Sequence, residues 1–286
     1  MFSLQIQNLS KTYPVFKLDN VSFSLEKGYI MGFIGRNGAG KTTTLKSMLH
    51  FVQPDCGKVL INGFDIDKDE LSIKNSIGFV SGQDCFYNSK TIKTVTNVTK
   101  KFFPKWNDQL YKELLQKFNL DESKKIKNLS AGMKIKYQIA LAMCHDASLL
   151  ILDEPTSGLD PVSRDELVSL FQNYVEDGNH SIIFSTHITS DLEKCADYVT
   201  YIKNGKIQVS TDIVSLKENY LLVAGRKSDL CDEIKEKIIG LHAHNFGFEG
   251  MILASDKGIF EKSVSDSATF EITKPSLEDI MIHCER

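Results

Sequence analysis

The sequence lacks the features that mark secreted, zinc-stapled or membrane-spanning chains. Its six cysteines lie far apart, with no C-x-x-C pair and no histidine at zinc-ligand spacing, so neither a disulfide framework nor a structural zinc site is expected. No apolar run reaches the roughly 18 residues that a membrane helix needs, and residues 1–11 do not read as a signal peptide. We therefore expect a folded chain in a reduced, cytosolic setting, and any membrane-spanning part should belong to another chain.

A large excess of charge of either sign is also missing. With 34 basic and 37 acidic residues the formal net charge is -3, which gives no electrostatic footprint for wrapping nucleic acid. The hydrophobic fraction of 42% and the charged fraction of 25% are typical of an ordinary globular protein. A length of 286 residues favours one large domain followed by a smaller one. No internal repeat is present, so two tandem copies of one domain are excluded.

The order of the apolar patterns predicts an α/β fold. Short apolar segments bounded by turn residues predict strands at 4–8, 21–25, 30–34, 59–61, 77–80, 149–152 and 181–185. Helical spacing of apolar residues predicts helices at 41–50, within 91–120, and at 133–143, 164–175 and 189–195. The alternation of strands and helices after residue 130 is typical of a parallel sheet with crossover helices. Past residue 210 the chain changes to charged segments and weak strands, so we expect domains at 1–212 and 213–286.

A glycine-rich segment lies between a predicted strand and a predicted helix. Residues 35–42, Gly-Arg-Asn-Gly-Ala-Gly-Lys-Thr, match the phosphate-loop pattern G-x-x-x-x-G-K-[ST] in full. Glycines let backbone N–H groups turn inward, and the helix that follows presents its positive end to the same place, so a polyphosphate is the expected ligand. Lys41 should neutralise the β and γ phosphates, and the Thr42 hydroxyl should coordinate Mg²⁺. The residues expected to contact the ligand are Asn37, Gly38, Ala39, Gly40, Lys41, Thr42 and Thr43.

A second element places two carboxylates at the end of an apolar strand. Residues 149–154 read Leu-Leu-Ile-Leu-Asp-Glu, and strand ends face the ligand crevice in a doubly wound sheet. Asp153 is expected to reach the Mg²⁺ shell, and Glu154 is expected to polarise an attacking water as general base. A plain solvated loop is the alternative, and the apolar run before the pair disfavours it.

In this order the motifs resemble those of the ATP-binding cassette (ABC) family over roughly residues 2 to 210. Leu129-Ser130-Ala131-Gly132-Met133 stands where that family has its signature loop, usually L-S-G-G-Q, before a helix. Ser157-Gly158-Leu159-Asp160 is similar to the D-loop, His187 to the switch histidine, and Tyr13 to the aromatic residue that stacks on adenine. Taken singly, each also has a structural reading, as a helix cap, a structural histidine or a packed tyrosine.

The resemblance implies a P-loop NTPase core with a parallel sheet, an antiparallel β subdomain and a helical insertion at about residues 90–145, followed by a small C-terminal α+β domain. It implies an ATPase that uses ATP and Mg²⁺, with Glu154 and His187 as catalytic residues. Ser130 and Gly132 would then act on the ATP of a second ABC subunit, in a homodimer or heterodimer, and Asp160 would be a further nucleotide-binding residue. The pair would drive a separate transmembrane permease subunit from the cytoplasmic face of the cell membrane.

Two segments depart from the family pattern. Ala131 stands for a glycine and Met133 for a glutamine of the usual signature, a variant similar to bacterial exporters with separate membrane subunits, so activity should survive. In residues 77–83, an ungapped match places Gly82 where the family has its glutamine. Gln83, the expected Q-loop contact with nucleotide, Mg²⁺ and the membrane partner, therefore lies one residue late.

Two further segments resemble the ABC-2 type branch that exports peptides or drug-like compounds. Residues 102–107, Phe-Phe-Pro-Lys-Trp-Asn, lie in the helical insertion, and their aromatic rings either line a groove for a coupling helix of the membrane subunit or fill a small helical core. Residues 275–281 resemble the segment with which chains of the same branch end. His242 and His244 share one face of an expected strand, but no carboxylate or cysteine stands at ligand spacing, so no metal site is expected there.

The leading function is therefore the ATP-hydrolysing subunit of an ABC exporter. A soluble ABC ATPase acting on nucleic acid or ribosomes usually carries two cassettes or a long coiled-coil insertion, and this chain has neither, so no nucleic-acid partner is expected. A regulatory module that binds ATP without turnover is a second alternative. Such a module would be expected to have lost some of the four residues Lys41, Asp153, Glu154 and His187.

Overall fold

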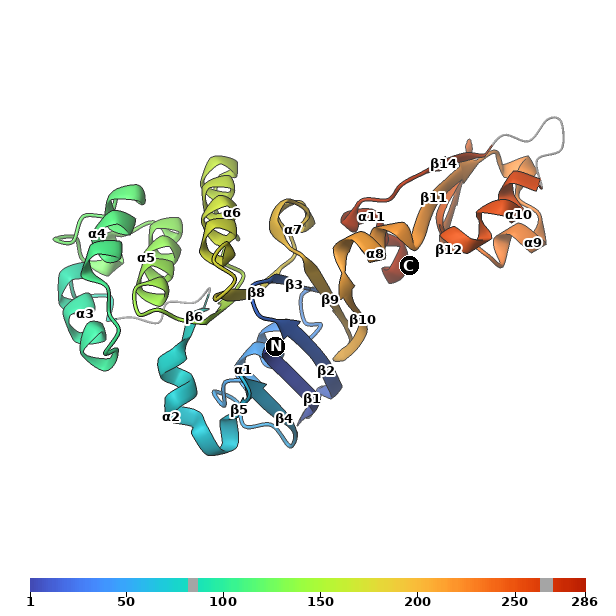
Figure 1. Ribbon diagram of the computed structural model, residues 1–286. Helices are drawn as coiled ribbons and strands as arrows, with labels where there is room; N and C mark the ends of the chain where they lie inside the picture. The colour runs from blue at the N-terminus through green and yellow to red at the C-terminus, as the bar shows by residue number, and fades with distance from the viewer. Residues whose placement is uncertain (82–86, 263–269) are drawn as a thin grey trace. The chain divides into compact units, whose positions relative to one another are not determined.

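A computed structural model describes residues 1–81, 87–262 and 270–286 of the chain. These residues divide into two compact units, Met1–Ser210 and Thr211–Arg286. Figure 1 follows the chain from the blue N-terminus to the red C-terminus. No helix in the described ranges combines the length and the apolar character required for crossing a membrane.

A six-stranded sheet forms the centre of the first unit, with the strand order β10-β9-β3-β8-β7-β6. Its strands are β3 (Ile30–Ile34), β6 (Ile77–Ser81), β7 (Leu149–Asp153), β8 (Ser181–Thr186), β9 (Tyr198–Lys203) and β10 (Lys206–Asp212). The pairs β3–β8, β3–β9, β6–β7 and β7–β8 are all parallel. Strands β3, β7 and β8 are buried along their whole length, as expected for parallel strands covered on both faces.

An antiparallel sheet packs beside this centre, with the order β2-β1-β4-β5. Its strands are β1 (Phe2–Tyr13), β2 (Phe16–Glu26), β4 (Cys56–Ile61) and β5 (Phe64–Asp65). Leu4 and Ile6 of β1 lie opposite Leu25 and Phe23 of β2, so apolar side chains meet in cross-strand pairs. These side chains share one core with Phe33 of the central sheet, which fixes the start of the glycine-rich segment against the antiparallel sheet.

Helices surround the sheets of the first unit. They are α1 (Lys41–Ser47), α2 (Ile66–Ser76), α3 (Ile92–Thr99), α4 (Asp108–Lys117), α5 (Ala131–Met143), α6 (Pro161–Val175) and α7 (Thr189–Cys195), with 3-10 turns at Lys100–Phe102 and Ile126–Asn128. Figure 1 shows α3, α4 and α5 gathered beyond β6 as the helical insertion. Within it, the Thr96 hydroxyl lies 2.8 Å from the Tyr111 hydroxyl and 2.9 Å from the Tyr137 hydroxyl, so the buried polar groups satisfy one another.

The second unit is an α+β domain with a core of its own. Its sheet has the order β12-β13-β11-β14, formed by β11 (Tyr220–Gly225), β12 (Ile239–His244), β13 (Gly247–Leu253) and β14 (Glu271–Thr273). The helices are α8 (Ile213–Glu218), α9 (Asp232–Lys235), α10 (Lys257–Lys262) and α11 (Leu277–Glu285), with 3-10 turns at Lys227–Asp229 and Ala254–Asp256. Val223, Phe248, Ile252 and Phe260 pack together as its buried core.

Candidate functional site

The glycine-rich loop joins β3 to α1 at the carboxyl end of the central sheet. Gly38 and Gly40 have φ angles of +80° and +115°, which favour glycine at both positions. A Cβ atom on Gly40 would also stand 2.9 Å from the Phe16 ring. Ala39 is held by its backbone, because its N–H donates to the Arg36 carbonyl at 3.0 Å and its carbonyl accepts from the Gly205 N–H at 2.9 Å. The loop therefore has the backbone shape that the sequence motif requires.

Lys41 is the first residue of α1, and its side chain turns back into the loop. The side chain is only 6% exposed. Its ammonium group donates to the Gly35 carbonyl at 2.7 Å and to the Arg36 carbonyl at 3.4 Å. The same nitrogen lies 3.4 Å from a carboxylate oxygen of Glu154. The positive charge is thus fixed inside the curve of the loop, close to the acidic strand end.

Asp153 ends β7 and accepts hydrogen bonds from two hydroxyl groups. Thr42 Oγ1 lies 2.8 Å from Asp153 Oδ2, and Ser185 Oγ donates to Asp153 Oδ1 at 2.6 Å. Thr42 and Asp153 thus present hydroxyl and carboxylate oxygens side by side, and such hard oxygen ligands fit Mg²⁺, which commonly takes only one or two protein ligands beside phosphates and water. Among the residues that the structure describes, no group of three His, Cys, Asp or Glu side chains could hold a metal by itself, the strand of His242 and His244 included.

Glu154 follows Asp153 in the left-handed region, with a φ angle of +53°. A residue other than glycine is held in that region only where its surroundings determine it. Here the Glu154 N–H donates to the carbonyl and the hydroxyl of Ser185 at 3.1 and 3.0 Å. Its carboxylate lies 2.9 Å from His187 Nδ1 and 3.4 Å from the Lys41 ammonium group. The fixed backbone and these two contacts aim the carboxylate at the space beside the loop.

Ser185 is a site residue that the sequence motifs do not identify. It lies directly opposite Asp153 in the β7–β8 pairing, is fully buried, and bonds both Asp153 and Glu154. Its position near the end of an apolar strand that is parallel to the acidic strand is the signal that could have indicated it.

The signature and D-loop residues lie at helix ends. Ser130 Oγ accepts the N–H of Met133 at 3.2 Å and caps α5, while Asp160 accepts the N–H of Ser163 at 3.0 Å and caps α6. The hydrogen bond from Ser163 holds the pKa of the Asp160 carboxyl below its usual range. A Cβ atom on Gly132 would stand 2.6 Å from the Leu159 side chain, so the signature and the D-loop pack against each other.

The remaining predicted residues differ in where they lie. Tyr13 ends β1, is 37% exposed, and lies 6.4 Å from the Phe16 ring between ring centroids. Asn37 is exposed and Thr43 is partly buried, both within the loop and first turn that follow β3. Gln83 lies outside the described residues. In the described part of the chain, Tyr13, Ser130 and Asp160 make no hydrogen bond or ion pair with Lys41, Asp153 or Glu154.

A groove of about 350 Å³ lies beside the helical insertion. Phe51, Phe79, Phe103 and Leu141 line it, so the groove is largely apolar. The expected aromatic segment divides between two environments. Phe103 stacks on His145 at 3.9 Å between ring centroids and lines the groove, whereas Trp106 packs against Tyr111 at 5.6 Å inside the helical insertion.

The chain is similar in sequence to known proteins. A family model described as ABC transporter matches residues 18–157. The bacitracin transport ATP-binding protein BcrA of Bacillus licheniformis is 30% identical over 98% of this chain and 96% of its own length. The ABC transporter ATP-binding protein YtrB of Bacillus subtilis is 30% identical over 77% of this chain and 75% of its own length. The lantibiotic transport ATP-binding protein SrtF of Streptococcus pyogenes is 33% identical over 71% of this chain and 88% of its own length.

Solved structures show the same fold. The ATP-binding subunit of an ABC transporter superposes with a TM-score of 0.69 at 25% identity, covering 75% of this chain and 91% of that one. An ATP-binding cassette, solved as a dimer in a post-hydrolysis state with ADP and phosphate, superposes with a TM-score of 0.66 at 21% identity. It covers 73% of this chain and 98% of that one.

Proposed function

The chain belongs to the ABC transporter family as an ATP-binding subunit, and from this premise we propose that it hydrolyses ATP to drive transport through a separate membrane subunit. One observation supports turnover above all. The Glu154 carboxylate is held between His187 and Lys41, directly after the Asp153–Thr42 pair. A module that only binds ATP would have no need of a carboxylate fixed in this way.

Each residue of this group has a role in the proposed reaction. The loop at residues 35–43 binds the phosphates, and Lys41 neutralises their charge. Thr42 and Asp153 would hold Mg²⁺, which would supply charge neutralisation for the phosphates. Glu154 orients the attacking water and accepts its proton, and His187 keeps the Glu154 carboxylate in place. Gln83 is proposed as a further contact with the nucleotide and Mg²⁺.

We propose that two subunits act as a head-to-tail pair. Ser130, Gly132 and Asp160 do not bond to the phosphate-binding group of their own chain, and they lie at exposed or partly exposed helix ends. Such positions suit contact with the ATP of a second subunit, while Tyr13 stacks on the adenine of its own. ATP then closes the pair and loss of the γ-phosphate opens it, which is a ligand-controlled two-state switch.

The transported compound is proposed to be a peptide or a drug-like molecule. Relatives are named for bacitracin transport, lantibiotic transport and linearmycin resistance, and the bacitracin relative matches nearly the whole chain. None of these names refers to ribosomes or nucleic acid, which disfavours the soluble alternative. The apolar groove with Phe51, Phe79 and Phe103 is proposed to receive a cytoplasmic coupling helix of the membrane subunit. The chain would then lie on the cytoplasmic face of the membrane.

Co-purification from detergent-solubilised membranes of the native host tests this function. We expect a polytopic membrane protein in stoichiometric amount and an ATPase rate that rises when that protein is present. The Lys41→Ala variant serves as the control for contaminating ATPases. Recovery of ATPase activity with ribosomes or nucleic acid, and without a membrane protein, would favour the soluble alternative instead.

A further inference from the structure

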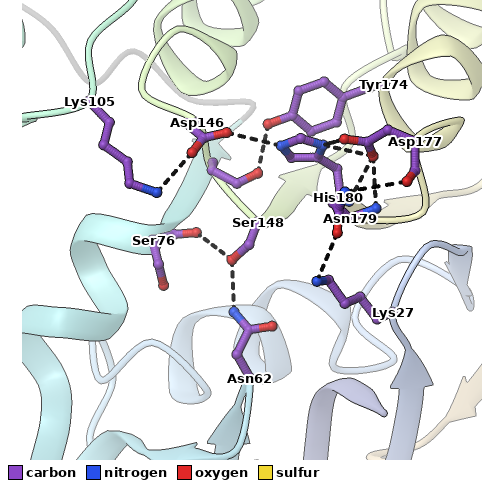
Figure 2. Close-up of polar contacts among 11 residues, drawn as sticks. Lys27, Asn62, Ser76, Lys105, Asp146, Ser148, Tyr174, Asp177, Asn179 and His180 are labelled. Atoms are coloured by element: carbon purple, nitrogen blue, oxygen red, sulfur yellow. Dashed lines mark hydrogen bonds and ion pairs between the residues drawn. The ribbon is translucent and has the colours of Figure 1, made fainter.

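A larger cavity, of about 630 Å³, lies at the amino ends of the central parallel strands, whereas the phosphate-binding loop lies at their carboxyl ends. Several of its lining residues come shortly before strands: Lys27 before β3, Ser76 before β6, Ser148 before β7 and Asn179 before β8. The phosphate-binding loop and Asp153 instead follow the ends of these parallel strands. The proposed ATPase reaction therefore makes no use of this cavity, whose side chains Figure 2 shows converging from separate loops.

Both carboxylates of the cavity already have cationic or imidazole partners. Asp146 accepts from the Lys105 ammonium group at 2.9 Å, and His180 Nε2 lies 3.3 Å from its other oxygen. Asp177 lies 3.0 Å from His180 Nδ1, so His180 bridges the two carboxylates (Figure 2). The hydrogen bond from Lys105 holds the pKa of Asp146 below its usual range. The negative charge of the cavity is thus already compensated.

Lys27 differs from the other charged residues of the cavity. Its ammonium group contacts Asn179 Oδ1 at 3.1 Å, and within the described residues it makes no ion pair with a carboxylate (Figure 2). Asn75 and Ser72 of α2 line the same cavity with exposed polar side chains. A positive charge beside free polar groups suits an incoming carboxylate, which would accept several charge-assisted hydrogen bonds. An incoming ammonium group would instead face Lys27 and Lys105 together.

The cavity adjoins the apolar groove proposed for the coupling helix. Phe103 and His145 line both, and their rings stack with an interplanar angle of 14°. His145 is only 3% exposed, and its Nδ1 atom is buried without a hydrogen-bond partner. Burial lowers the pKa of His145 to about 4, so its ring is neutral near pH 7. The wall that the cavity and the groove share is therefore uncharged. The apolar groove lies on one side of this wall, and the cavity that contains Lys27 lies on the other.

We propose that the polar cavity receives an acidic side chain from the same cytoplasmic segment of the membrane subunit whose helix occupies the apolar groove. This inference rests on the proposed function. The apolar groove binds the apolar face of the helix, and the chain that continues past Phe103 and His145 places a carboxylate against Lys27 and the polar groups of α2. The ion pair fixes the direction and register of the segment in the groove, a role that electrostatic complementarity often has in interfaces.

Site-specific photo-crosslinking in the native host tests the proposal. The full-length chain carries p-benzoylphenylalanine at Phe51 in the groove, at Asn75 in the polar cavity, or at Lys112 on α4 as a control that lines neither. We expect the Phe51 and Asn75 positions to crosslink to one membrane protein, at residues that are close in its sequence, with an Asp or Glu beside the Asn75 crosslink. We expect no such crosslink from the Lys112 position.

The other outcomes separate the two proposals. If Phe51 crosslinks to a membrane subunit but Asn75 crosslinks to a distant segment, to a second copy of this chain or to nothing, the acidic contact is wrong and the proposed function stands. If neither position crosslinks to a membrane protein, the proposed function fails as well.

A charge reversal supplies a second measurement. We expect the Lys27→Glu variant to co-purify with about tenfold less of the membrane subunit than wild type does at low salt, because a like charge would face the incoming carboxylate. Lys112→Glu, which adds the same charge change on an exposed face of α4, should retain it as wild type does. Equal retention by both variants would overturn the proposed ion pair.

Discussion

At the scale of single residues, Lys41 contacts both the phosphate-binding loop and the acidic strand end. Its ammonium group bonds to carbonyls of the loop that precedes it and lies near Glu154, so the side chain is already in place for a phosphate group. Ser185 likewise joins two acidic residues of different roles, because its hydroxyl donates to Asp153 and accepts from the Glu154 N–H. The chemistry of the site depends on such shared contacts.

Replacing Lys41 with alanine should weaken ATP binding by about 10- to 100-fold, the loss expected when a hydrogen-bonded charge is removed from a phosphate. Isothermal calorimetry with ATP measures the change. Lys46→Ala removes a lysine from the same helix and should bind ATP as wild type does. Undiminished affinity in Lys41→Ala would mean that the loop is not the phosphate site.

Ser185→Ala should lower the free energy of unfolding by about 1–3 kcal/mol, because the buried Asp153 carboxylate loses its shortest hydrogen bond and the Glu154 N–H keeps only the Ser185 carbonyl as acceptor. It should also raise the Mg²⁺ concentration needed for half-maximal ATPase activity, since Asp153 would be less well positioned. Ser181→Ala is a matched control, because Ser181 accepts a hydrogen bond from Gly28 at 3.0 Å at the opposite end of β8. It should reduce stability in urea titrations without changing the Mg²⁺ dependence, and identical Mg²⁺ dependence in both variants would contradict the role given to Ser185.

His145 should make stability depend on pH. Its pKa is about 4 in the folded chain because of burial, against about 6.5 when unfolded. The unfolded chain therefore binds more protons between these values, so the contribution is full above about pH 6.5 and falls as the pH drops toward about 4. Between about pH 7 and pH 4.5 this contribution should fall by about 2 kcal/mol. Urea titrations of wild type and His145→Gln should diverge by that amount, and parallel pH profiles would refute the burial argument.

Individual elements differ in how well the sequence predicts them. Strands β3 and β7 are short apolar runs bounded by turn residues, and the structure confirms both at the predicted positions. The sequence pattern does not predict helix α2, because only Ile66 and Ile73 of its 11 residues are buried and no apolar period is visible. The helix predicted over residues 41–50 ends earlier, at Ser47. The apolar pattern of the sequence thus predicts elements in which a whole face is buried, and it fails to predict elements in which few residues are buried.

Helix α11 depends on a cap that can be tested. The Ser276 hydroxyl accepts the Asp279 N–H at 3.1 Å, while the Asp279 carboxylate accepts the Ser276 N–H at 2.9 Å, which is a capping box. Ser276→Ala should destabilise the helix by about 1 kcal/mol, seen as faster hydrogen exchange of the α11 amides. Ser276→Thr keeps a hydroxyl that can accept from the Asp279 N–H and donate to the Asp279 carboxylate, so it should exchange nearly as wild type does. Unchanged exchange in the alanine variant would show that the cap does not hold the helix.

At the scale of the whole molecule, the sequence motifs indicate more site residues than a single chain brings together. Lys41, Thr42, Asp153, Glu154 and His187 were expected from their motifs, and the structure brings them together. In the single chain, the side chains of Ser130 and Asp160 accept helix-capping hydrogen bonds, because the ligand proposed for them is bound by another copy. A separate small domain is predicted at residues 213–286 only by a change in sequence texture, and the structure has a compact unit with its own core at Thr211–Arg286.

The mass of the Glu154→Gln variant in the presence of Mg²⁺ and ATP tests the central claim most directly. The single chain has a mass of 32.2 kDa, and removing the general base should leave ATP bound and unhydrolysed. Static light scattering should therefore report a stable dimer of twice that mass, while Lys41→Ala stays monomeric under the same conditions. A Glu154→Gln variant that binds ATP in calorimetry and yet remains at 32.2 kDa would contradict an ATP-driven closure of paired subunits.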